Sequence, residues 1–441
     1  MYLPQNHASS NLVPTTPLDD PLYKRIAWRI VPVLMIAYVV AYIDRVNVGF
    51  AKLQMAGALG FSDAIFGLGA GLMFVGYCLF EIPSNLLLKK MGVRKTFLRI
   101  MLLWGLTTVA IMFVKTPTQF YVARFFLGVF EAGLFPGAIL YFTYWFPEER
   151  RGRIIGLFMS GGLIGNVLAG PISGATMKYL DGVGGLGGWQ WLYLTQGLPA
   201  VILGFVAYWW LCDTPREAHW LNAEEKKTIL SQVGTVSADH PASMGQIFHA
   251  LKDWRFCGFV LIDFLIIGGA YTMVFWVPTL IKSWGVADMA TIGLLSGIPS
   301  IAGVLGIILV CRHSDIKQER RWHFAVMALL AAVGLWLTTV VQGNLVASLI
   351  ALTVATLGIA VSTPLLVTTT TENLKPEMRA IGIPLLTSLG ILGGFVSPAV
   401  TGYINTTTGN PIYSMYLVIG LFVAAAALML VVAPRGIAKP V

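Results

Sequence analysis

Charged residues are scarce in this chain of 441 residues. Asp, Glu, Lys and Arg together make up 12% of the sequence and hydrophobic residues make up 56%, and the mean hydropathy is +0.74. Soluble globular domains carry about 25% charged residues, and half that density cannot cover the surface of a soluble particle of this size. The composition excludes a soluble enzyme, a disordered scaffold and a nucleic-acid-binding protein, and it indicates an integral membrane protein.

Cysteine and histidine are also few. The four cysteines stand far apart and form no CxxC pair, so neither a disulfide framework nor a metal site is indicated. The six histidines fall in hydrophilic segments or at the ends of apolar runs. Because the sequence holds no Cys, His and Asp cluster with catalytic or metal-binding spacing, we expect no enzyme, no metal and no cofactor.

Twelve apolar runs are long enough to cross a bilayer. A spanning helix needs about 20 mainly apolar residues, and a helix satisfies every backbone polar group internally. The centres of the runs lie near Ala37, Phe74, Thr107, Gly133, Leu163, Ala200, Gly268, Ser300, Ala331, Thr356, Leu389 and Phe422. The sequence therefore predicts an all-α membrane protein with 12 transmembrane helices.

The basic residues predict the orientation of these spans. If the N-terminus lies inside, most of the 30 Lys and Arg residues fall in inner segments. The outer segments then hold only Lys52, Lys115, Lys178 and Lys282. This excess of inner positive charge favours an even number of spans with both termini cytoplasmic. The formal net charge of +9 reflects membrane topology and not nucleic-acid binding.

The longest polar loop divides the spans into two sets of six. We expect a disordered cytoplasmic tail at 1–23, six-helix bundles at 24–212 and 253–434, a cytoplasmic loop between them at 213–252, and a cytoplasmic tail at 435–441. An internal repeat supports this division, because shifts of 226 to 229 residues pair Gly67 with Gly293 and Pro171 with Pro398. Two repeated bundles that rock about a central site give alternating access in secondary transporters.

Six charged residues fall inside the predicted spans, where a lipid-facing charge costs about 2.5–3.5 kcal/mol. They are Asp44, Arg45, Glu81, Arg124, Glu131 and Asp263. Arg124 and Glu131 are separated by nearly two helical turns and point the same way, whereas the adjacent Asp44 and Arg45 diverge. We expect these four side chains to converge in the first half of the molecule.

Two arginines and two acids in one cavity suit proton-coupled anion transport. A guanidinium holds a carboxylate through two parallel hydrogen bonds. Burial favours the neutral form of a carboxyl group, and a nearby arginine favours its charged form. Anion binding to an arginine therefore favours protonation of Asp44 or Glu131, which is the linkage that a symporter needs. Internal ion pairs that only hold helices together are the alternative.

The other two charges have simpler explanations. Glu81 lies near the inner end of the second span, where we expect it to pair with basic loop residues or to cap a helix. Asp263 has no basic residue near it in the sequence. It either lines the cavity or is a satisfied packing residue.

Several stretches resemble the major facilitator superfamily. Residues 83–95 (PSNLLLKKMGVRK) are similar to the loop between the second and third spans of that family. Four further stretches resemble the anion:cation symporter branch of that family, and within it the tartrate, phthalate and hydroxyphenylacetate permeases. They are residues 42–47 (YIDRVN), 124–133 (RFFLGVFEAG), 144–150 (YWFPEER) and 312–323 (RHSDIKQERRWH). The similarity runs from about residue 24 to residue 433.

The resemblance implies the two-bundle fold of that family and uptake of small organic acids with protons across the bacterial inner membrane. It implies that the proton-coupling acids are Asp44 and Glu131. It also implies that the substrate anion contacts Arg45 and Arg124, with Tyr42 and Tyr77 nearby.

Four residues depart from the family pattern. Thr387 stands where we expect an asparagine, and Gln196 stands where an acid is common. Asn166 and Asp263 are polar where the family often has apolar or small residues. The candidate cavity-lining residues are Asn166, Asp263, Trp276, Thr387 and Ser388.

The leading hypothesis is a proton-coupled symporter that imports a small carboxylate, either a hydroxy acid such as tartrate or an aromatic acid. An exporter of organic anions or drugs is the alternative. A receptor is disfavoured because the loop at 213–252 and both tails are too short for a signalling domain. We expect a monomer, since the two halves supply the whole pathway, with the substrate anion and the lipid bilayer as its partners.

Overall fold

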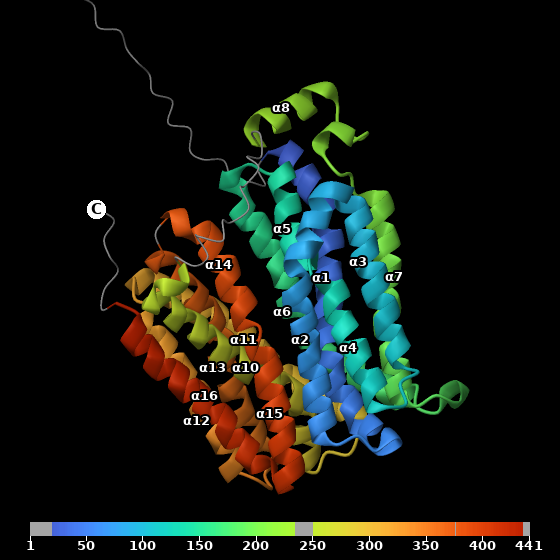
Figure 1. The fold of residues 1–441 in the computed structure, drawn as a ribbon, viewed down its shortest axis with the longest axis vertical. Coiled ribbons are helices and arrows are strands. Elements are labelled where there is room, and N and C mark those ends of the chain that lie inside the picture. Colours follow the sequence, from blue (N-terminus) through green and yellow to red (C-terminus); the bar gives the residue numbers. More distant parts are fainter. Residues whose placement is uncertain (1–19, 234–249, 375, 435–441) are drawn as a thin grey trace, which may run out of the picture.

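The computed structural model describes residues 20–233, 250–374 and 376–434. Long helices form two bundles that lie side by side (Figure 1). The first bundle contains α1 (Pro21–Leu59), α2 (Asp63–Met91), α3 (Val93–Ile111), α4 (Pro117–Glu131), α5 (Leu134–Trp145), α6 (Glu148–Tyr179) and α7 (Gly188–Trp210). The second contains α10 (Trp254–Ser283), α11 (Met289–Lys317), α12 (Arg321–Val340), α13 (Leu345–Asn373), α14 (Pro376–Gly390), α15 (Gly393–Thr408) and α16 (Pro411–Val432).

The helices account for the twelve predicted crossings. Eleven segments of the described chain are long and apolar enough to span a membrane, and two of them join a pair of helices, α4 with α5 and α14 with α15. Helix α3 is the twelfth crossing. It falls outside that set because Arg94, Lys95 and Arg99 crowd its first two turns. The predicted all-α fold of two six-helix bundles is confirmed.

Two segments outside the bundles differ from expectation. Residues 21–23, which we assigned to the N-terminal tail, form the first turn of α1. Inside the expected loop at 213–252, α8 (Ala223–Val233) covers one end of the first bundle (Figure 1), where the hydroxyl of Tyr23 donates a hydrogen bond to Gln232 at 2.6 Å. The predicted tails at 1–19 and 435–441 lie outside the described residues.

Side-chain caps begin several helices at the ends of the spans. Thr116 and Gln119 form a capping box at the start of α4, where each side chain accepts a hydrogen bond from the other residue's amide. Asp253 caps α10 and Asn410 caps α16. Such caps satisfy amides that have no partner within the helix, so they fix where each crossing starts.

Glycines let the bundles approach closely at two equivalent crossings. Helix α2 packs on α15, and α6 packs on α11. A Cβ atom at Gly67 of α2 would overlap the carbonyl oxygen of Pro398, and one at Gly293 of α11 would overlap that of Gly170. Gly67 and Gly293 are the pair related by the repeat. The repeat therefore marks corresponding contacts between the two halves.

A polar cluster joins the bundles at the end away from α8. Asp63 of α2 pairs with Lys52 of α1 at 2.9 Å. The same carboxylate accepts hydrogen bonds from Asn405 of α15 at 3.0 Å and from the indole of Trp276 of α10 at 3.4 Å. We call these four residues the Asp63 cluster. The bundles lie closest together at this end and diverge toward α8 (Figure 1).

An ion pair at the same end joins α6 to α11. Lys178, in the last turn of α6, lies 2.7 Å from Asp288, the N-cap of α11. Hydrogen bonds from Lys178 and from the hydroxyl and amide of Thr291 lower the pKa of Asp288 to about 2. The carboxylate therefore keeps its charge when the medium becomes acidic.

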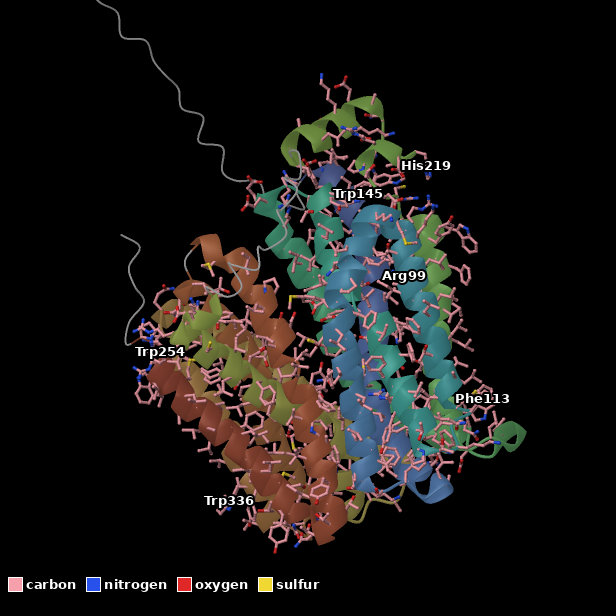
Figure 2. The ribbon with its side chains drawn as sticks, in the orientation of Figure 1. Arg99, Phe113, Trp145, His219, Trp254 and Trp336 are labelled. Carbon is pink, nitrogen blue, oxygen red and sulfur yellow. The ribbon has the colours of Figure 1, made fainter. Side chains whose placement is uncertain are left out.

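The outer surface of both bundles is apolar. Large hydrophobic side chains such as Leu309 and Val431 are 66% and 68% exposed, as expected for groups that contact lipid tails and not water. Trp254 and Trp336 lie near opposite ends of the second bundle (Figure 2), where aromatic rings favour the two membrane interfaces.

We expect Asp63→Ala to loosen the end that the Asp63 cluster closes. The substitution leaves Lys52 without its counter-ion, and a buried polar group that loses its partner costs about 1–3 kcal/mol. Amide hydrogen exchange should then speed up at residues 48–60 and 398–406, while Glu224→Gln on the surface of α8 serves as the control. Unchanged exchange in both segments would show that the cluster does not hold this end together.

Candidate functional site

A buried ion pair lies where the two bundles meet. Arg45 of α1 donates to Glu131 through Nε at 2.7 Å and through Nη2 at 2.6 Å. Both bonds end on Oε1, and Oε2 of Glu131 is buried without a hydrogen-bond partner. The side chain of Arg45 is 10% exposed and that of Glu131 is fully buried. Glu131 is the last residue of α4, so the carboxylate stands at the break before α5.

Three tyrosines surround the guanidinium of Arg45. The rings of Tyr42 and Tyr77 lie 5.6 and 5.3 Å from it, and Arg45 donates to the hydroxyl of Tyr271 on α10 at 3.4 Å. Tyr271 belongs to the second bundle, where its ring also packs on Phe74 of α2. Arg45 therefore contacts side chains from both halves of the molecule.

Asp44 points away from this pair, into the first bundle. Its carboxylate accepts hydrogen bonds from the indole of Trp104 at 2.7 Å, the hydroxyl of Thr108 at 3.0 Å and the amide of Asn47 at 2.8 Å. The residue is fully buried. Three donors compensate the lost hydration of the carboxylate, so Asp44 needs no arginine in contact.

Arg124 is also fully buried and lies against the backbone of α2. It donates to the carbonyl oxygens of Gly69 at 3.4 Å and Ala70 at 3.5 Å, and its Nη1 has no hydrogen-bond partner. Helical phase places Arg124 and Glu131 on one face of α4, as expected. The ion pair nevertheless forms between Glu131 and Arg45, because α1 brings its arginine to the end of α4.

Glu81 has a partner that the sequence did not indicate. We expected basic loop residues, whereas its Oε2 accepts a hydrogen bond from the hydroxyl of Ser388 on α14 at 3.0 Å. The neighbouring Thr387 bonds to carbonyl oxygens of its own helix. Ser388, an expected cavity-lining residue, therefore faces the first bundle and Thr387 does not share that contact.

The other candidate residues are spread through the molecule. Trp276 belongs to the Asp63 cluster, away from the tyrosines around Arg45. Asp263 is 3% exposed, and a Cβ atom at Gly390 would overlap its carboxylate. Asn166 is half-buried on α6, next to Gly165, which packs against Tyr42. Among these three residues, Asn166 is the one whose chain neighbour packs against a tyrosine that surrounds Arg45.

Tyr271 is the site residue that the sequence analysis missed. One signal was present, because Tyr271 follows Arg45 by 226 residues, the spacing of the internal repeat. Among the described residues, no group of three or more His, Cys, Asp or Glu side chains is arranged to hold a metal ion. The side chains of the site offer ion pairing and hydrogen bonding.

Known proteins resemble this chain over most of its length. The profile of the Major Facilitator Superfamily matches residues 34–398 and 287–440. A relative from Agrobacterium vitis named for tartrate transport is 41% identical over 421 residues, which cover 96% of this chain and 93% of the relative. A quinolone resistance transporter of Acinetobacter baumannii is 39% identical over 399 residues, which cover 90% of this chain and 92% of that protein.

The fold has a close counterpart among solved structures. A bacterial homologue of the human lysosomal transporter Spinster, in an inward-facing and unoccupied conformation, matches with a TM-score of 0.79. The two sequences are 17% identical, and the match covers 93% of this chain and 97% of the solved one. The family match, the close relatives and the fold agree that this chain is a transport protein, not an enzyme, and that it belongs to the Major Facilitator Superfamily.

Proposed function

We propose that the protein is a proton-coupled symporter that imports a small organic carboxylate by alternating access. The observation that carries this proposal is the ion pair between Arg45 and Glu131 at the meeting point of the bundles. A strong anion-binding group and a titratable group there share one contact. Binding of an anion to Arg45 therefore changes the proton affinity of Glu131, and binding of a proton to Glu131 changes the anion affinity of Arg45.

Anion binding and proton binding favour each other in this arrangement. When the substrate carboxylate takes the guanidinium of Arg45, Glu131 loses the cation that balances its charge. An unpaired buried carboxylate is strongly disfavoured, so Glu131 then takes up a proton. By linkage, protonation of Glu131 frees Arg45 for the substrate. Tyr42 and Tyr77 supply rings and hydroxyls around the bound anion.

The charge balance of the interior also supports proton uptake. Three buried acids, Asp44, Glu131 and Asp263, and the part-buried Glu81 share the crossings around the site with two buried arginines, Arg45 and Arg124. A substrate anion adds another negative charge to this excess. Since buried charges need compensation, we expect protons to enter with the anion.

Asp44 and Arg124 form the second part of the proposed machinery. Arg124 acts electrostatically on Asp44 and Glu131. We propose that Arg124 attracts the anion through its positive potential and that Asp44 is the second coupling acid.

The charge distribution supports one orientation of the protein in the membrane. With basic residues inside, both termini and α8 face the cytoplasm, and the Asp63 cluster closes the outer end. We propose that the protein works as a monomer in the bacterial inner membrane, since both halves of the site come from one chain.

The names of the relatives point to two substrate classes. The relative named for tartrate transport supports an organic acid as substrate. The relative named for quinolone resistance favours a second candidate function, the export of organic anions or drugs. Both functions use the same two-bundle fold, so direct transport measurements distinguish them.

Uptake into proteoliposomes with an imposed inward proton gradient tests the proposal. The panel consists of tartrate, a sugar acid, phthalate, 4-hydroxyphenylacetate and nicotinate. We expect accumulation of at least one member and its loss when a protonophore is added. Efflux from preloaded vesicles without accumulation would favour the exporter. No movement of any member by folded, inserted protein would contradict the substrate class.

Glu131→Gln should uncouple substrate movement from the proton gradient. Glutamine resembles the protonated acid and cannot release a proton, so Arg45 stays free for the anion. We expect exchange of labelled for unlabelled substrate to continue and gradient-driven accumulation to stop. Glu149→Gln, on the exposed first turn of α6, is the control. If Glu131→Gln still accumulates substrate, coupling must reside in Asp44.

Substitutions of the two arginines distinguish direct contact with the substrate from electrostatic attraction at a distance. Arg45→Lys removes the planar fork that matches a carboxylate, and we expect at least about a tenfold loss of substrate affinity. Arg124→Lys keeps the positive charge, so its loss of affinity should be smaller. Titration calorimetry of both variants measures the difference. Equal losses would mean that Arg124 contacts the substrate directly.

A further inference from the structure

Glu81 lies one helical turn beyond Tyr77, one of the three tyrosines that surround the guanidinium of Arg45. Tyr77 and Glu81 are four residues apart on α2, which puts them on one face and about 6 Å apart along the helix axis. Tyr77 contacts the guanidinium, and Arg45 is within electrostatic range of Glu81. Glu81 is therefore about one helical turn away from the tyrosine that contacts the proposed anion-binding arginine.

Two hydrogen bonds join α2 to Ser388 of the second bundle, and one of them ends on Glu81. The hydroxyl of Ser388 donates to Glu81 at 3.0 Å, and the thiol of Cys78 donates to the carbonyl oxygen of Ser388 at 3.2 Å. Ser388 lies two residues before the end of α14 at Gly390. Residues from both halves of the molecule thus meet at this point, as they do at Arg45.

The hydrogen-bonding capacity left at this contact is accepting. Ser388 has already donated its single hydroxyl proton, and its oxygen retains lone pairs. An ionised Glu81 has no donor, and its Oε1 is free of the bond from Ser388. In the part of the chain that the structure describes, no lysine or arginine pairs with Glu81. The group that complements this contact is a hydrogen-bond donor.

We infer that Glu81 and Ser388 form a second polar pole of the substrate site, which takes a hydroxyl or protonated amine at the end of the substrate away from Arg45. This inference rests on the proposed function and narrows its substrate class. A carboxylate that also carries a hydrogen-bond donor is preferred over a plain carboxylate of the same size. Glu81 is on this account a specificity residue, since Arg45 still holds the carboxylate.

Matched pairs of acids test the inference by titration calorimetry on the purified full-length protein. Tartrate is compared with succinate, and 4-hydroxyphenylacetate with phenylacetate, while aspartate replaces the hydroxyls by an ammonium group. A hydrogen bond to a charged acceptor is worth about tenfold or more in affinity. We expect at least one donor-bearing acid to bind the wild-type protein about tenfold more tightly than its plain partner.

Two substitutions of Glu81 distinguish the kinds of donor. Glu81→Leu removes the acceptor, so the preference should fall to near parity while the plain acids bind as before. Glu81→Gln keeps an accepting oxygen and removes the charge, so a preference for hydroxyls should survive and one for ammonium should be lost. Ser388→Ala should weaken the preference partly, and Glu149→Gln should leave it unchanged.

The outcomes separate the two proposals. If no acid binds the folded wild-type protein, the proposed carboxylate transport fails. If acids bind without any preference for donors, or if Glu81→Leu keeps the full preference, the second pole is overturned while carboxylate binding stands. Should Glu81→Leu not fold, the result with aspartate and Glu81→Gln decides, since that variant replaces a single carboxylate oxygen by an amide nitrogen.

Discussion

The ion pair between Arg45 and Glu131 is the constraint on which the site depends. Each charge is buried, and removing either partner from a buried pair costs about 3–5 kcal/mol. Neither group therefore changes partners without compensation by another charge. In the proposed function a substrate anion compensates Arg45 and a proton compensates Glu131. The ion pair then opens only when the anion and the proton bind together.

The packing of the two halves determines which contacts between the bundles lie near the ion pair. Close glycine contacts at Gly67 and Gly293, together with the Asp63 cluster, bind the bundles firmly at one end. Arg45 and Tyr271 lie near the middle of α1 and α10, and Glu81 and Ser388 join α2 to α14. In the proposed alternating-access cycle, rocking of one bundle against the other changes these contacts. Events at the ion pair are thereby linked to the relative position of the halves.

Sequence patterns predicted the fold and the charged residues better than they predicted their partners. Length and hydropathy are sufficient for twelve crossings because the bilayer sets the length of each helix. Helical phase correctly placed Arg124 and Glu131 on one face. It carries no information on which neighbouring helix meets that face, so the pairing of Glu131 with Arg45 and of Glu81 with Ser388 emerged only from the packing. Trp276 shows the same limit, since its contact with Asp63 depends on two helices from different halves.

In the two proposals, the acids around the site supply selectivity as well as coupling. Arginine alone attracts any anion, and a site with only Arg45 and Arg124 would hold its substrate through charge with little regard to shape. Glu81 adds an acceptor without a cation of its own, and acids that offer no donor leave that acceptor unsatisfied. Unsatisfied buried acceptors discriminate more strongly than additional apolar contacts do. In this proposal Arg45 holds the carboxylate, and Glu81 distinguishes among the acids that Arg45 can bind.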